Sequence, residues 1–198
     1  MGHGTTSYQR FLANLVVRET GGGSKPYLGN KAVQWDKIDV SSVQFVRMTR
    51  SDLERFRLQH GDLLVCEGGE VGRAAIWESS LGECYYQKAL HRLRPVCGFQ
   101  PRLMLAFLQQ WTSRDLLSEY VSQTSIAHLT QEKLSSIPLP TPAPNEQKAI
   151  VDHIGGHDAK VSLEVQQLEK LRATKSGLMD DLLTGRVRVT DLLAAHPG

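Results

Sequence analysis

The spacing of apolar residues divides the chain of 198 residues into two parts of different character. In the first part, short apolar runs alternate with polar residues or end at glycines, which predicts strands, turns and a few helices. In the second part, apolar residues recur three or four positions apart, which predicts one long helix. The segment "SIPLPTPAPNEQ", residues 136–147, separates the two.

Several elements of the first part follow from its pattern. The run "VQFVRM" (43–48) alternates and predicts a strand. The run "TRSDLERFRLQHGD" (49–62) predicts a short helix that ends at Gly61. Either Thr49 or Ser51 is suited to cap that helix, and Leu53, Phe56 and Leu58 would face inward. The glycine-rich "ETGGGSKPYLGNKAVQW" (19–35) is typical of a loop.

A hairpin and a helix complete the first part. Strands are expected from Leu63 to Cys66 and from Val71 to Trp77, joined by a turn at Gly68-Gly69. A further strand is expected in "CYYQKALHRLRPV" (84–96). The run from 101 to 121 is the clearest helix, with apolar side chains at helical spacing. Its expected core residues are Leu103, Phe107, Trp111, Leu116 or Leu117, and Tyr120.

The proline-rich segment stiffens the chain before a second helix. Each proline fixes its own φ and holds the preceding residue in extended geometry, so Ile137 and Leu139 should lie extended on one side. Pro138 and Pro140 donate no ladder hydrogen bonds, so the segment is an edge strand or a polyproline stretch. Asn145 is the expected N-cap of the helix that follows.

That helix carries a narrow apolar seam. Gly155-Gly156 predicts a kink or break, because each glycine costs about 1 kcal/mol relative to alanine. Beyond it, the seam is heptad-like with one irregular step, which predicts pairing with another helix. Gly185 is suited to end the helix in left-handed conformation. The seam residues are Val161, Val165, Leu168, Leu171, Leu178 and Leu182.

The fold predicted is therefore mixed α/β (α+β): a globular domain over residues 1–155, then a long coiled-coil-forming helix and tail over 156–198. A composition of 40% apolar and 22% charged residues favours a folded protein. The sequence contains no run of eighteen apolar residues, so no membrane helix is predicted. The N-terminus also lacks a signal-peptide pattern, so a cytoplasmic location is expected. Cys66, Cys84 and Cys97 form no CxxC pair, which favours reduced thiols. A net charge of +2, with the basic excess in the first part, permits binding to nucleic acid.

The second part resembles the DNA specificity subunit of type I restriction–modification systems. The resemblance lies in "SIPLPTPAPNEQKAIVDHI" followed by "DAKVSLEVQQLEKLRATKSGLMDDLLTGRVRV", with Lys175, Gly177, Leu178 and Leu182 to Gly185 matching the family's pattern. More loosely, "GDLLVCEGGEVGRAAI", "CYYQKALHRLRP" and "SQTSIAHLTQEKLSSIPLP" resemble its recognition domain, so the similarity covers about residues 20–190. It departs at "RFLANLVVRETGGG" and at Gly155-Gly156.

The resemblance implies an architecture and partners. Family subunits carry two recognition domains and two long helices that pair antiparallel, whereas this chain has one of each. It therefore resembles a half-subunit or a fragment, and a homodimer through the seam would rebuild the whole. The implied partners are double-stranded DNA, methyltransferase (M) subunits and the restriction (R) subunit, with no membrane. The chain itself would need no cofactor, because S-adenosylmethionine belongs to the methyltransferase.

The resemblance also implies DNA-contacting residues, each with a plainer structural reading. The glycine turn suits a hairpin needing positive φ as well as a close approach to DNA. Polar residues in the loop could contact base edges or phosphates, or they could simply cap a turn. Basic residues on the strand could contact phosphates, or they could simply face solvent. The candidates are Lys25, Tyr27, Asn30, Lys31, Gly69, Arg73, Lys88, Arg92, Arg94, Thr124, Ser125 and His128.

Signals for other functions are weak. No phosphate-binding glycine loop followed by Lys-Ser/Thr occurs, and Glu132-Lys133 is only half of a nuclease element. His153 and His157 have a metal-compatible spacing, but two glycines lie between them and no third ligand is evident, so no metal is expected. The hypotheses are a non-catalytic DNA specificity subunit, a protein-interaction adaptor with a coiled-coil helix and no DNA role, and a nuclease.

Overall fold

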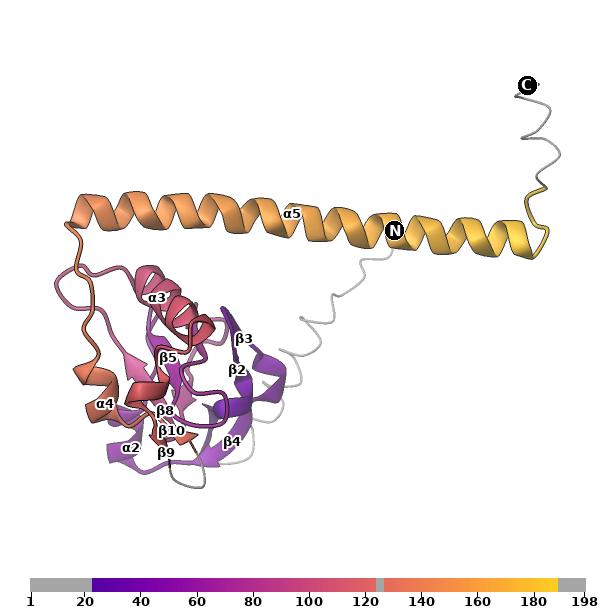
Figure 1. Ribbon diagram of the computed structural model, residues 1–198. Coiled ribbons are helices and arrows are strands. Elements are labelled where there is room, and N and C mark those ends of the chain that lie inside the picture. The colour runs from indigo at the N-terminus through magenta and orange to yellow at the C-terminus, as the bar shows by residue number, and fades with distance from the viewer. Residues whose placement is uncertain (1–22, 124–126, 189–198) are drawn as a thin grey trace. The chain divides into compact units, whose positions relative to one another are not determined.

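The structure is a computed structural model that describes residues 23–123 and 127–188. The chain divides into two compact units, and the division falls after Lys148, a few residues before the domain boundary expected from sequence. Small sheets and short helices build the first unit, and one long helix continues through the second (Figure 1). The predicted fold class, mixed α/β with a long C-terminal helix, is confirmed.

The strands of the first unit are short and join into small sheets. Their orders are β4-β1-β7, β6-β5-β8, β2-β3 and β10-β9. All of these pairings are antiparallel except that of β1 with β7. The strands are β1 (Ser24–Leu28), β2 (Val33–Gln34), β3 (Lys37–Ile38), β4 (Gln44–Arg47), β5 (Leu63–Cys66), β6 (Ala74–Ile76), β7 (Tyr85–Tyr86), β8 (Leu90–Leu93), β9 (Ser122–Gln123) and β10 (Ala127–His128).

Helices and short 3-10 turns connect these strands. The 3-10 turns are η1 (Asn30–Ala32), η2 (Val40–Ser42) and η3 (Ser118–Tyr120). The α-helices are α2 (Arg50–Arg55), α3 (Pro101–Ser113), α4 (Gln131–Ser136) and α5 (Pro144–Leu183). None of the helices among the described residues is long and apolar enough to cross a membrane.

Strand β5 is the centre of the first unit. It pairs with β6 along one edge and β8 along the other, and its four residues are all buried. Because side chains alternate along a strand, Leu64 and Cys66 enter one hydrophobic cluster, while Leu63 and Val65 enter a second cluster with α3. The predicted β5–β6 hairpin is confirmed, although β6 is shorter than the expected run to Trp77.

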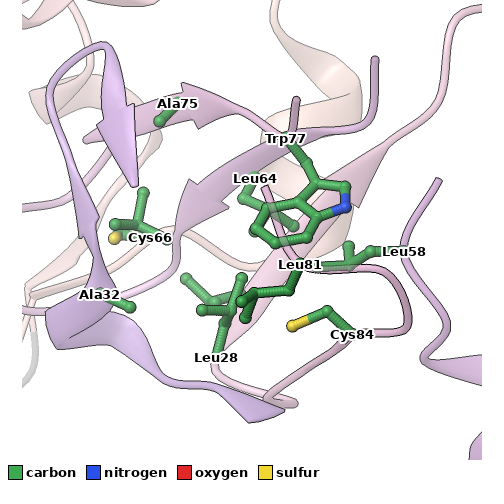
Figure 2. Packing of buried hydrophobic residues seen from close by; sticks show 11 residues of the cluster. Leu28, Ala32, Leu58, Leu64, Cys66, Ala75, Trp77, Leu81 and Cys84 are labelled. Carbon is green, nitrogen blue, oxygen red and sulfur yellow. The ribbon is translucent and has the colours of Figure 1, made fainter. Parts of the chain in front are cut away.

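The first cluster packs around Trp77, which is 1% exposed. Figure 2 shows its ring close to Leu64 and Leu81, with Cys84 and Leu58 further along the same cluster. Burial raises the pKa of the Cys84 thiol to about 12, so this cysteine stays neutral and acts as a small apolar side chain. All three cysteines are free thiols.

Helix α2 confirms its predicted cap. Thr49 Oγ1 accepts from the Asp52 N–H at 3.2 Å, and Asp52 accepts from the Thr49 N–H, which makes a capping box. Helix α3 ends earlier than predicted, at Ser113 rather than near residue 121. Its buried residues are Leu103, Leu105 and Leu108, whereas the expected core pair Phe107 and Trp111 is partly buried and stacks at 5.6 Å between ring centroids.

The prediction of a loop over residues 19–35 is wrong for the residues that form β1. Pro26 is tolerated in this strand because the pairing with β7 begins only at Tyr27, so no ladder hydrogen bond is lost on that side. The strand expected over 84–96 divides into β7 and β8 at a turn. Both differences arise because strand pairing depends on partners far away in the sequence.

The proline-rich segment forms no strand, so the edge-strand alternative is wrong, and Ile137 at its start is extended. Ile137 and Leu139 are partly buried while Pro138 and Pro140 are exposed, as the alternation predicted. Helix α5 begins at Pro144, one residue before the expected N-cap, because proline fits the first helical turn without losing a bond. Gln147 anchors this start: it is 6% exposed, accepts from the Gln100 N–H at 3.1 Å and donates to the Pro142 carbonyl at 2.9 Å.

The break predicted at Gly155-Gly156 is wrong, because α5 is helical without interruption over 40 residues. Neither glycine has a positive φ, and long helical stretches flank both. The roughly 1 kcal/mol cost of each glycine is small beside the hydrogen-bonded turns on either side. The predicted end is confirmed: Gly185 has φ 71°, and its N–H donates to the Leu182 carbonyl at 3.3 Å.

Replacing the central glycines by alanine should therefore strengthen α5. A Cβ at Gly155 or Gly156 meets no atom within 4 Å, so Gly155→Ala and Gly156→Ala should each stabilise the helix by about 1 kcal/mol. Amide hydrogen exchange over residues 150–165 should slow by about fivefold per substitution. Gly185→Ala is the matched control and should fray the helix end, because its φ is left-handed. Unchanged or faster exchange in the central variants would contradict an unbroken helix.

Candidate nucleic-acid interface

A glycine turn follows β5 directly and is fixed by its own backbone. The Gly72 N–H donates to the Cys66 carbonyl at 3.1 Å, and the Cys66 N–H donates to the Arg73 carbonyl at 2.8 Å. Gly69 and Gly72 have φ of 76° and 82°, which residues with a side chain rarely adopt. A Cβ at Gly72 would lie 2.5 Å from Leu117 Cδ1, so a larger residue there would also force the Leu117 side chain to shift.

The side chains of Asn30 on η1 and of Arg73 at the end of the turn hold its shape. Asn30 Nδ2 donates to the Gly68 carbonyl at 2.7 Å, and Arg73 Nη2 donates to the Asn30 carbonyl at 3.1 Å. Arg73 also pairs with Glu70 at 3.1 Å, and its side chain is only 16% exposed. Asn30 and Arg73 are thus brought together as predicted site residues, and their visible contacts maintain the shape of the turn.

His128 of β10 lies against the same turn. It forms an isolated antiparallel bridge with Gly68, and its Nδ1 lies 3.9 Å from Glu67 Oε1. The Leu129 N–H donates to the Glu67 carbonyl at 2.8 Å, which ties the β9–β10 hairpin to the end of β5. Thr124 and Ser125, predicted on the same grounds, lie outside the described residues.

A groove of about 490 Å³ adjoins this turn through Glu67. Three cationic side chains and one histidine line it, against one carboxylate, so its charge favours an anionic ligand. Aromatic, aliphatic and polar side chains complete the walls. The lining residues are Arg55, Phe56, Glu67, Tyr86, Lys88, Leu90, His91, Arg92, Leu93, Gln131, Leu134 and Ser135. We call this surface the basic groove.

The cations of the basic groove differ in how many contacts they make within the protein. Arg92 Nη1 donates to the carbonyls of Arg55 and Arg57 at 3.2 and 3.0 Å, and its guanidinium lies 5.4 Å from the Tyr86 ring centroid. Arg55 and Lys88 are exposed and lie 5.2 and 6.0 Å from the Phe56 ring centroid. Lys88 and Arg55 are therefore available to meet an anion, whereas Arg92 also joins α2 to β8.

Four predicted residues lie apart from the turn and the groove. Lys25 donates to Glu83 Oε2 at 2.5 Å, and this hydrogen bond holds the pKa of Glu83 below its usual value. Tyr27, also on β1, has a raised pKa because of burial and, to a lesser extent, because of Asp52. Lys31 is exposed on η1.

Arg94, the fourth of these residues, pairs with a buried carboxylate. Its Nε and Nη2 donate to the two carboxylate oxygens of Asp62 at 2.7 and 2.8 Å. Asp62 is 1% exposed and also accepts from the Gln59 N–H at 2.7 Å. The hydrogen bond to Asp62 raises the pKa of Arg94, and the pair is a bidentate ion pair with one buried partner.

The predicted seam of α5 is exposed along its length. Its six residues are between 39% and 62% exposed, which is high for valine and leucine. Leu163 and Met179, outside the predicted seam, are exposed as well. Among the described residues there is no group of three or more His, Cys, Asp or Glu side chains placed to hold a metal.

Reasoning from sequence missed part of the groove. Arg55, Gln131 and Ser135 line it but were not among the candidates. The pair of arginines in "ERFR", which includes Arg55, was the available signal, but its significance depends on contacts with Arg92, 37 positions away.

Residues 13–173 match the family described as the type I restriction modification DNA specificity domain. This match covers most of the chain, so the protein belongs to that family. The resemblance inferred from the proline segment and the long helix is thereby confirmed.

Two solved structures share the fold. The HsdS subunit from Thermoanaerobacter tengcongensis aligns with a TM-score of 0.57 and 18% identity, over 81% of this chain and 37% of that chain. A chain from a structure concerned with complex assembly and conformational transition of the type I R-M system aligns with a TM-score of 0.59 and 19% identity, over 81% of this chain and 38% of that chain. This protein therefore spans less than two fifths of either chain.

The Asp62–Arg94 pair generates a stability prediction. Arg94→Ala leaves the buried Asp62 carboxylate without its cation, which should lower the free energy of unfolding by about 3 kcal/mol. Urea unfolding followed by Trp fluorescence measures this change. The control Arg47→Ala, at an exposed position on β4, should stay within about 0.5 kcal/mol of the unmodified protein.

A second variant separates the buried charge from lost packing. Adding Asp62→Asn to Arg94→Ala should recover part of the stability, because an unpaired amide costs less to bury than an unpaired carboxylate. No loss of stability in Arg94→Ala would show that the ion pair with Asp62 is dispensable for the fold.

Proposed function

We propose that this chain is the DNA-recognition component of a type I restriction–modification complex and reads one half of a split DNA target. The observation that carries the proposal is the basic groove, which adjoins the glycine turn in a member of a DNA specificity family. The first unit is assigned to recognition and the long helix of the second unit to spacing and assembly.

The two parts of the surface suit different parts of DNA. Lys88, Arg55 and Arg92 supply positive charge for phosphates, which fixes position without reading sequence. The glycine turn, which contains Gly69, lets neighbouring groups approach its backbone closely, and Asn30 and His128 lie beside it. Amide, imidazole and backbone groups are suited to base edges in the major groove. Thr124 and Ser125 belong to this proposal by their place in the sequence between β9 and β10.

Helix α5 is proposed to measure the separation between two recognition domains. Forty residues at about 1.5 Å each make a rod of about 60 Å. In the proposed assembly its seam pairs with a second copy, and the resulting two-fold symmetry predicts a symmetric split target. Methyltransferase (M) subunits would dock on the paired helices, and the restriction (R) subunit would join them, so methylation and cleavage belong to those partners in the cytoplasm.

The charge of the basic groove can be tested on DNA of arbitrary sequence. The affinity of the chain for a duplex should fall steeply with salt, because bound cations release counterions. Lys88→Ala and Arg55→Ala should each reduce the slope of log affinity against log salt by about 0.9. Fluorescence anisotropy with a labelled duplex, between about 50 and 200 mM salt, measures this slope.

A charge outside the groove provides the control. Lys37→Ala removes an exposed lysine on β3 and should leave the slope unchanged. Equal slopes for all variants would exclude the groove as a phosphate-binding surface. Absence of any salt-dependent binding would favour the adaptor alternative, in which the helix binds a protein and DNA has no role.

The seam can be tested by mass in solution. Light scattering should give about twice the single-chain mass of 22.0 kDa for the unmodified protein. Leu168→Glu with Leu171→Glu should yield single chains that bind DNA more weakly, because two carboxylates would be buried in the seam. Leu163→Glu, at an exposed leucine outside the predicted seam, should leave the mass unchanged. A double variant that keeps the mass of the pair would refute pairing through these residues.

A further inference from the structure

The exposed seam of α5 carries charges at positions that a paired helix would bury. Because α5 is helical without a break, a seven-residue repeat can be followed along it from Ile150 to Leu182. Two rows result, and both face the same side of the helix. Row A contains Ile154, Val161, Leu168, Lys175 and Leu182, and row D contains Ile150, His157, Glu164, Leu171 and Leu178.

The strict repeat differs from the seam predicted by sequence at one residue. Glu164 takes the place of Val165 in row D, which removes the irregular step. Lys175 lies in row A, eleven positions later. Both are exposed in the single chain, as are the neighbouring Leu168 at 46% and Leu171 at 58%. Each row is thus an apolar row that contains a charge of opposite sign.

We propose that α5 pairs antiparallel with a second copy of this chain in one register, set by Lys175 against the partner's Glu164. This inference rests on the self-pairing in the proposed function and specifies its geometry. In antiparallel helices, row A of one faces row D of the other. Placing Lys175 opposite the partner's Glu164 puts Leu168 opposite the partner's Leu171 and Val161 opposite the partner's Leu178.

The two-fold axis then crosses α5 between Glu169 and Lys170, and the ion pair occurs twice. Every row position from Val161 to Leu178 meets a residue of matching character, either apolar with apolar or charge with opposite charge. The register is self-consistent, because exchanging the two copies reproduces the same pairs.

Other arrangements bury the same charges badly. A shift of one heptad in one direction places Leu168 against the partner's Glu164 and Lys175 against the partner's His157. A shift in the other direction places Lys175 against the partner's Leu171 and Leu182 against the partner's Glu164. Parallel pairing in register places each charge against its own copy. Unpaired or like charges inside a helix pair are unfavourable, so only one of these arrangements is compatible with both residues.

A charge exchange tests the register. Glu164→Lys alone places lysine against lysine in both ionic layers, and Lys175→Glu alone places glutamate against glutamate. Each should weaken self-association by about a hundredfold, since each like-charge contact costs about tenfold or more. An equimolar mixture of the two variants should form a mixed pair, because lysines then face glutamates in both layers. The double variant Glu164→Lys/Lys175→Glu should pair with itself again. Sedimentation velocity on the full chain measures all four.

Outward charges on the same helix provide the control. Glu169 and Lys170 lie outside rows A and D. The variants Glu169→Lys and Lys170→Glu should therefore form pairs with the same mass as the pair of unmodified chains. Circular dichroism should show equal helicity for all variants, so that loss of pairing is not mistaken for unfolding.

Three outcomes would overturn the register. The single variants could pair with themselves as well as the unmodified chain does, the mixture could remain single chains, or the unmodified chain could fail to pair at any concentration. The last would also remove self-pairing from the proposed function. DNA recognition by the first unit is judged separately, by the salt slopes of the Lys88 and Arg55 variants, so the register and DNA recognition can fail independently.

Discussion

The burial of β5 on both faces and along both edges is the constraint on which the first unit depends. Leu64 and Cys66 fill the cluster around Trp77, while Leu63 and Val65 fill the cluster under α3. A strand enclosed in this way cannot shift by one residue without exchanging the two sets of side chains. The residues after Cys66 are therefore held in place, and Glu67 joins the glycine turn, the β9–β10 hairpin and the basic groove at that point.

The arginines of this chain are divided between support and surface. Arg94 neutralises buried Asp62, Arg73 holds the glycine turn through Asn30, and Arg92 joins two backbone carbonyls of the α2 region to β8. Arg55 and Lys88 remain exposed above Phe56. A basic strand thus contributes less free charge than its composition indicates, because part of that charge already has partners within the fold.

The sequence predicted elements whose causes are local. The α2 cap at Thr49, the β5–β6 hairpin and the left-handed end at Gly185 depend on neighbouring residues, and all are present. Contacts between distant segments were not predictable: Asn30 reaches Gly68 across 38 positions, and Arg92 reaches Arg55 across 37. The break predicted at Gly155-Gly156 was wrong, because the cost of about 1 kcal/mol for each glycine was considered without the stabilising helical turns on either side. The family itself could be recognised, because its pattern lies along the proline-rich segment and the continuous helix that follows it.

The exposed leucines of α5 bear on how many chains can associate through this helix. An apolar strip that can slide along its neighbour tends to recruit more copies, and contacts that do not close lead to filaments or aggregates. A strip that contains Glu164 and Lys175 offers few favourable offsets, and the proposed two-fold pair covers the strip of both copies from Val161 to Leu178. If the chain pairs as proposed, growth would stop at two chains. The same charges that reduce the apolar surface of the seam would then also limit aggregation at high concentration.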